Sequence, residues 1–223
     1  NFEKIKRIKD FQGSSAISID LPEISFKDIA GHYKAKERLK EIVNLLKNKD
    51  KIKKFNIKIP KGVLLYGPPG TGKTMLAKAI AKEAELPFIM TTANDLINTP
   101  NLINDIFKKA KEYAPCIVFI DEIDAFRKRG TSAHNESFFA PKVNQLLTSL
   151  DGSNSCEDVF VVAATNKKET IDEAILRAGR IDIHININHL DKDARRYFLE
   201  KIILRDTSSK FDIEKLLVYT SGM

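Results

Sequence analysis

The sequence of 223 residues is poor in features that mark several broad classes of protein. It has no Trp, and its two cysteines, Cys116 and Cys156, have a spacing that suggests neither a metal-binding pair nor a disulfide framework. No stretch approaches the ~18 apolar residues that a membrane-spanning helix requires, and no signal peptide is visible. These absences exclude a disulfide-stapled domain and favour a reducing compartment.

Histidine is scarce as well, and the His-Glu-x-x-His pattern of zinc proteases does not occur. The four histidines are scattered along the chain at His32, His134, His184 and His189. Such a distribution is typical of surface or packing residues rather than of metal ligands. The sequence therefore predicts no peptidase site within these residues.

The net charge of +7 is concentrated in the first part of the chain. Residues 1–61 carry 16 Lys and Arg against 8 Asp and Glu, a net +8, whereas the remaining residues carry 21 against 22. A basic segment is usually a solvated surface, although it can also bind nucleic acid or, beside a membrane, anionic lipid. No base-reading motif accompanies the charge, so nucleic acid is not the partner that we expect.

Apolar residues make up 43% of the chain, which is enough for a sizeable core in one large domain. Residues 1–23 are basic and then Ser-rich, and they predict a linker. Across residues 24–190, short apolar runs alternate with amphipathic segments, a pattern typical of a parallel sheet covered by helices on both faces. The strand pattern then ends, so residues 191–223 predict the start of a small helical domain.

The individual elements follow from the same pattern. The apolar runs expected as strands are residues 63–66, 88–90, 117–120, 159–164 and 181–187. The segments expected as helices are residues 34–47, 73–84, 102–113, 141–150, 171–177, 194–204 and 213–219.

The strongest motif is Gly67-Pro68-Pro69-Gly70-Thr71-Gly72-Lys73-Thr74, which matches G-x-x-x-x-G-K-[ST] between a predicted strand and a predicted helix. Its glycines let the backbone turn its N–H groups toward phosphate oxygens, and the helix presents its positive N-terminus to the same anion. Lys73 would reach the β- and γ-phosphates, and the Thr74 hydroxyl would bind Mg²⁺. Together with Met75, these residues are the candidate site for ATP or ADP. A Gly/Pro turn that matches by chance is the alternative, and the apolar run before it argues against that.

A second motif is the apolar run that ends in Asp121 and Glu122. An apolar strand with acids at its carboxyl end delivers them to the crevice where parallel sheets bind ligands. Asp121 would hold Mg²⁺ directly or through water, and Glu122 would act as general base on the attacking water. An Asp-Glu pair is common on surfaces, so the signal lies in its position behind an apolar strand and downstream of the phosphate loop.

Three further candidates follow in the second half of the chain. Asn166 ends an apolar run, and its amide could orient water against the γ-phosphate, although an Asn in this place can equally be a turn former. Arg177 and Arg180 could stabilise the charge that develops on a phosphate during transfer, supplied to a neighbouring molecule. Two arginines three residues apart could equally belong to a salt-bridged loop.

Together, GPPGTGKT, CIVFIDEIDA, AATN and LRAGRID occur in the order and spacing of AAA+ ATPases, and the chain most closely resembles FtsH-type membrane-bound proteases. The resemblance implies a P-loop NTPase fold, which is an α/β three-layer αβα sandwich with a mostly parallel sheet, followed by the start of a helical lid. It also implies that Ile29 and Ala30 contact adenine and that Asn166 senses the γ-phosphate. Arg177 and Arg180 then occupy the positions of arginine fingers in a ring, typically a hexamer.

The same resemblance implies a longer protein that acts on polypeptides. Because the chain begins with Asn1 and stops at Met223 without a closing element, we expect both ends to be cut. The missing part upstream would anchor the protein in a membrane, with this domain on the cytoplasmic side. A zinc protease domain would follow residue 223.

Three positions depart from the family pattern. Residues 91–102 (TTANDLINTPNL) lack the aromatic residue and the glycine of the usual pore loop and form a shorter segment. Ile183 stands in the place of a further arginine, and Ile202 in that of a histidine near the nucleotide. An ATP-driven protein unfoldase is the leading interpretation. A non-proteolytic chaperone or assembly scaffold and a nucleic-acid remodeller are the alternatives.

Overall fold

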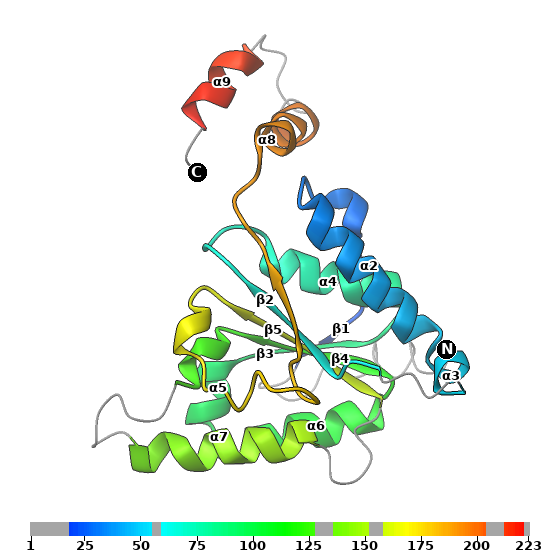
Figure 1. The fold of residues 1–223 in the computed structure, drawn as a ribbon, viewed down its shortest axis with the longest axis vertical. Coiled ribbons are helices and arrows are strands. Elements are labelled where there is room, and N and C mark those ends of the chain that lie inside the picture. The colour runs from blue at the N-terminus through cyan, green and yellow to red at the C-terminus, as the bar shows by residue number, and fades with distance from the viewer. Residues whose placement is uncertain (1–17, 55–58, 128–135, 152–157, 204–211, 221–223) are drawn as a thin grey trace.

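The computed structural model describes residues 18–54, 59–127, 136–151, 158–203 and 212–220. They form a six-stranded sheet in the order β1-β3-β4-β5-β2-β6 (Figure 1). The strands are β1 (Ser18–Asp20), β2 (Gly62–Tyr66), β3 (Phe88–Thr92), β4 (Cys116–Asp121), β5 (Val159–Thr165) and β6 (Ile183–Asn186). Neighbouring strands are parallel except β1 and β3, which are antiparallel. The prediction of a mostly parallel sheet is therefore confirmed.

The strands are almost entirely apolar because both faces of the sheet are covered. Every residue of β5 is buried, and β4 is buried up to its last residue, Asp121. Buried parallel strands have this near-continuous apolar sequence. Each of the five predicted strands is confirmed, with ends within two residues of those expected.

Helices lie on both faces of the sheet and divide the core into two layers (Figure 1). The helices are α2 (Tyr33–Lys47), α3 (Lys49–Lys53), α4 (Lys73–Ala84), α5 (Ala93–Asn98), α6 (Leu102–Glu112) and α7 (Glu136–Asp151). Leu65 and its partner Ala164 face the layer of α2 and α4. Leu64 and its partner Ala163 face the layer of α5, α6 and α7. This alternation produces the expected αβα sandwich.

The prediction that residues 1–23 form a linker was wrong for residues 18–20. Ser18–Asp20, assigned to the linker, forms β1 and pairs Ile19 with Ile89 at the edge of the sheet. Three residues are too few to show a period in the sequence, so only the partner strand reveals this element. The rest of the predicted linker before residue 18 lies outside the described residues.

The helix expected at residues 171–177 is also absent, since these residues form a series of turns. The Asp172 carboxylate accepts a hydrogen bond from the Ala174 amide at 2.9 Å, and the Ile175 amide donates to the Asp172 carbonyl at 3.0 Å. A local side-chain bond of this kind competes with helix formation. Likewise α7 begins before Pro141, and α5 was not expected at all.

Beyond β6 the chain forms α8 (Lys192–Phe198), a π-helical turn (Leu199–Ile203) and α9 (Ile213–Tyr219). In Figure 1 these helices lie apart from the sheet, on the far side of α2 and α4 from α6 and α7. The helical pattern predicted for this end of the chain is confirmed, with α9 at the expected residues. No helix in the described ranges is long and apolar enough to cross a membrane.

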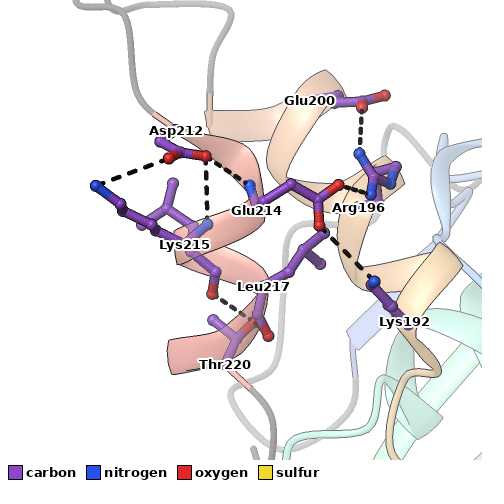
Figure 2. Close-up of polar contacts among 9 residues, drawn as sticks. Lys192, Arg196, Glu200, Asp212, Glu214, Lys215, Leu217 and Thr220 are labelled. Atoms are coloured by element: carbon purple, nitrogen blue, oxygen red, sulfur yellow. Dashed lines mark hydrogen bonds and ion pairs between the residues drawn. The ribbon is translucent and has the colours of Figure 1, made fainter.

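Glu214 joins α9 to α8 (Figure 2). Its carboxylate accepts a hydrogen bond from Arg196 and lies 3.7 Å from the ammonium of Lys192. Asp212 begins α9, because its Oδ1 accepts from the amides of Glu214 at 3.1 Å and Lys215 at 3.4 Å. The two helices are thus held by exposed polar contacts.

Replacing Glu214 with Gln should loosen α9 from α8 without disturbing the sheet. The hydrogen bond from Arg196, followed by its charge, holds the pKa of Glu214 below its usual value. A carboxyl with a lowered pKa stabilises the fold above its unfolded pKa, and that contribution is lost as the pH falls through the folded pKa. At neutral pH, the α9 amides of the variant should therefore exchange faster with solvent, while Tm stays within ~1 °C because the pair is exposed.

Glu200→Gln is the matched control, since it removes only a 3.9 Å contact to the same Arg196. Hydrogen exchange should show a smaller change in this variant. Equal exchange in α9 for both variants and the parent chain would contradict the role of Glu214.

Candidate nucleotide-binding site

The candidate residues of the two strongest motifs meet at one edge of the sheet. Tyr66 pairs with Thr165, so the phosphate loop after β2 and Asn166 after β5 begin side by side. Asp121 is the last residue of β4, the strand that pairs with β5 on its other side. Because parallel strands end at the same edge, three segments distant in sequence form one crevice.

The phosphate loop, residues 67–72, starts with an unusually close backbone approach. A Cβ atom at Gly67 would lie 2.1 Å from the carbonyl oxygen of Ile187, and the φ of Gly67 is +149°. The Gly67 amide donates to the Thr165 carbonyl at 3.3 Å, and the Ile187 amide donates to the Tyr66 carbonyl at 2.8 Å. The loop is therefore fixed between β5 and the end of β6, and only glycine fits its first position.

Lys73 begins α4 and turns its ammonium back over the loop. Its side chain is 8% exposed, and Nζ donates to the carbonyls of Gly67 at 2.9 Å and Pro68 at 2.7 Å. Thr71 Oγ1 also donates to the Pro68 carbonyl, at 2.9 Å. Burial lowers the pKa of Lys73, and the charges of Asp121 and Asp124 act in the opposite direction. Within the described residues this ammonium has no salt bridge, so its environment suits an incoming anion.

Asp121 is held through both of its carboxylate oxygens. Thr74 Oγ1 donates to Oδ2 at 3.1 Å, and the Glu122 amide donates to Oδ1 at 2.9 Å. A hydroxyl and a carboxylate are the oxygen ligands that Mg²⁺ uses beside phosphate groups. Thr74 and Asp121 therefore fit the predicted metal site in chemistry and in mutual position.

Glu122 is exposed at the mouth of the crevice and has a left-handed backbone, with φ +53°. Its Oε2 accepts a hydrogen bond from Asn94 Nδ2 at 3.2 Å. Asn94 lies on α5, so the sequence analysis missed it. No sequence signal pointed to it, because its contact with Glu122 depends on the pairing of β3 with β4.

The predicted adenine segment lies close to the phosphate loop. Ile29 and Ala30 are 6% and 7% exposed, and Lys36 Nζ donates to the Ile29 carbonyl. Burial lowers the pKa of His32, and the backbone of Thr71 acts in the opposite direction. His32 therefore lies near the phosphate loop. Met75, on the first turn of α4, is 42% exposed.

The two candidate arginines lie away from this crevice. The Arg180 carbonyl is 3.3 Å from a Cβ atom placed on Gly62, which is the opposite end of β2 from the phosphate loop. Arg180 makes a bidentate ion pair with Asp151, with both N–O distances 2.6 Å, and Nη1 donates to the Ala174 carbonyl at 2.6 Å. This hydrogen bonding raises the pKa of Arg180 and lowers that of Asp151. Arg177 is exposed.

The chain is similar in sequence to known proteins. A family model described as "ATPase family associated with various cellular activities (AAA)" matches residues 63–189. The chain is 46% identical over 182 residues to the ATP-dependent zinc metalloprotease FtsH of Parabacteroides distasonis, covering 78% of this chain and 27% of that protein. It is 42% identical over 216 residues to the FtsH of Aster yellows witches'-broom phytoplasma, covering 94% and 32%. The chain thus spans about a third of the length of these relatives.

Replacing Gly67 with Ala should disrupt the loop. The added Cβ would meet the backbone of Ile187, which has no side-chain freedom to move aside. We expect the free energy of unfolding to fall by about 3 kcal/mol or more, together with loss of nucleotide binding. Gly70→Ala is the control, because its φ is +73° but no atom of the described residues lies within 4 Å of the new Cβ. Its cost should be only about 1–2 kcal/mol of backbone strain. Equal losses in urea denaturation would contradict the importance of the close approach.

Proposed function

The chain belongs to the AAA family of ATPases, and from this premise we propose that it is the ATP-hydrolysing motor domain of an FtsH-like protease. The observation that carries the proposal is the buried ammonium of Lys73, which faces the glycine-rich loop rather than a carboxylate partner. A buried cation next to a loop of backbone amides and a helix N-terminus favours a polyphosphate.

In the proposed complex, the amides of residues 67–74 surround the phosphates and Lys73 neutralises the β- and γ-groups. Thr74 and Asp121 hold Mg²⁺, which when bound offsets the negative charge of the phosphates. Ile29, Ala30 and Met75 contact the adenine. The interaction of His32 with the backbone of Thr71 supports this assignment, because it indicates that the adenine segment lies near the loop.

Glu122 is the proposed general base of hydrolysis. Its carboxylate accepts a proton from a water molecule whose oxygen attacks the γ-phosphorus. The bond from that phosphorus to the oxygen of ADP breaks, and ADP and inorganic phosphate leave. Asn166 orients the water from the adjacent end of β5. Both side chains are exposed directly after the ends of β4 and β5, which supports these roles.

A ring of identical subunits, typically a hexamer, is the proposed assembly, with Arg177 of one subunit completing the site of the next. The arginines lie at the far end of β2 from the phosphate loop, which favours action on a neighbour over action on the same chain. Arg180 would have to release Asp151 to join Arg177. The substrates we propose are polypeptides, in keeping with the protease name of the relatives.

We also propose the organisation of the protein. Residues 24–190 form the nucleotide-binding domain, and a helical lid begins at residue 191. The whole protein is anchored in a membrane with this domain on the cytoplasmic side, and the net charge of +8 in residues 1–61 suits the vicinity of anionic lipid. Recovery of the full-length protein in the soluble fraction of lysed cells would contradict the anchor.

Two variants separate binding from hydrolysis. Lys73→Ala should weaken ATP binding by at least about 100-fold, because it removes the cation from the phosphate cage. Glu122→Gln should bind ATP with an affinity near that of the parent chain and hydrolyse it at least about 100-fold more slowly, because only the base is lost. Calorimetry and phosphate release measure the two effects. Unchanged affinity in Lys73→Ala would overturn the assigned site, and normal turnover in Glu122→Gln would remove Glu122 from the mechanism.

The two arginines should behave differently. Arg180→Ala should lower the free energy of unfolding by about 1–2 kcal/mol, less than a buried pair would because Asp151 is half-exposed. Arg177→Ala should keep the stability and nucleotide affinity of the parent chain but lose about 10³-fold in hydrolysis by the assembled protein.

Mixing tests whether Arg177 acts on a neighbour. A subunit with Arg177→Ala keeps an intact phosphate loop, and a subunit with Lys73→Ala keeps an intact arginine. Mixed rings of these two inactive variants should therefore recover hydrolysis. No recovery from a mixture that demonstrably forms rings would contradict the trans role.

A further inference from the structure

Thr165 is a buried residue with a hydroxyl group at the carboxyl end of β5, next to Asn166. It ends β5 and is 1% exposed. Its Oγ1 donates to Asp124 Oδ1 at 2.6 Å and accepts from the Lys167 amide at 2.9 Å. Its carbonyl accepts from the Gly67 amide at 3.3 Å. One residue is thus bonded to three different parts of the crevice.

Two of these bonds go to residues that lie next to or near a proposed catalytic residue. Asn166 lies between Thr165 and Lys167. The two hydrogen bonds of Thr165 Oγ1, with Asp124 and with the Lys167 amide, therefore restrict the backbone that carries the Asn166 side chain. Asp124 belongs to the turn that follows Glu122, in which the Ala125 amide donates to the Glu122 carbonyl at 3.0 Å. The bond between Thr165 and Asp124 therefore joins the base segment after β4 to the Asn166 segment after β5.

The bond between Thr165 and Asp124 has the geometry of a strong interaction. At 2.6 Å between a hydroxyl and a carboxylate, it lies in the range of charge-assisted hydrogen bonds. Burial lowers the pKa of Lys73 and the charge of Asp124 opposes this shift, so the Asp124 carboxylate lies within electrostatic range of that ammonium. A hydrogen bond in this place limits the movement of the Glu122 and Asn166 segments relative to each other, and hydrolysis is sensitive to such positioning.

We propose that Thr165 is a positioning residue, whose hydroxyl holds Asp124 and the Lys167 amide so that Glu122 and Asn166 address the same water. This inference rests on the proposed ATP hydrolysis and adds to it a residue that does not itself touch the nucleotide. Thr165 therefore contributes to the rate of hydrolysis and not to the affinity for ATP.

The test compares Thr165→Val, which keeps the shape and removes the hydroxyl, with Thr165→Ser, which keeps the hydroxyl. Thr91→Val is the matched control, because Thr91 is 5% exposed on β3 and its hydroxyl makes only a 3.4 Å bond to the Thr92 carbonyl. We expect Thr165→Val to bind ATP with Mg²⁺ within about twofold of the parent chain and to lose about 10- to 100-fold in kcat. Thr165→Ser should recover kcat to within about threefold, and Thr91→Val should change neither quantity.

A second measurement does not depend on hydrolysis. Amide exchange at Asn166 and Lys167 should accelerate in Thr165→Val and not in Thr91→Val, because the Lys167 amide loses its acceptor. Should Thr165→Val fail to fold, Asp124→Ala removes the same bond from its other partner and should show the same loss of kcat.

The outcomes separate this inference from the proposed function. Unchanged exchange at Lys167, or a Thr165→Val chain that hydrolyses ATP at the parent rate, overturns the role of Thr165 and leaves the ATPase assignment intact. A loss of ATP affinity with unchanged kcat overturns it too. A parent chain that binds no ATP refutes the proposed function, and the exchange measurement then still decides whether Thr165 fixes the Asn166 segment.

Discussion

The site depends on the parallel register of β2, β4 and β5. Parallel strands that end at one level bring the phosphate loop, the two acids and Asn166 to the same edge, although each comes from a different part of the chain. The register is specified by the core, because a slip of one residue would exchange the side chains that face the two helical layers. Leu64 and Leu65, which enter different layers, cannot exchange without exposing or overpacking one of them.

The close approach of Gly67 to Ile187 fixes the start of the phosphate loop relative to the paired strands. The Ile187 amide continues the bonding between β2 and β6 one residue beyond the end of β6. The phosphate loop therefore starts from a rigid point and not from a free strand end. A rigid start keeps the amides of the loop in place when no phosphate is bound, which lowers the entropic cost of binding.

Sequence patterns predicted an element correctly where residues close to it in the sequence decide its structure. The helix at residues 73–84 was predicted to the residue, because a loop of glycines precedes it and its apolar spacing is regular. Predictions failed where tertiary partners or competing local bonds decide. The strand at Ser18–Asp20 exists only by pairing with β3, and the Asp172 side chain replaces a helix with turns. Asn94 carried no signal, since its contact with Glu122 needs the sheet in three dimensions.

The geometry of β2 also bears on the proposed action of the arginines between subunits. Gly62 lies next to Arg180 at one end of the strand and Gly67 opens the phosphate loop at the other. Five residues of strand span roughly 16 Å, which exceeds the reach of an arginine side chain that is already bound to Asp151. Arg180 held in this way does not reach the phosphate loop of its own chain. In the proposed ring, the strand that leads into the phosphate loop of one subunit would carry the arginines toward the next, and hydrolysis would then depend on assembly.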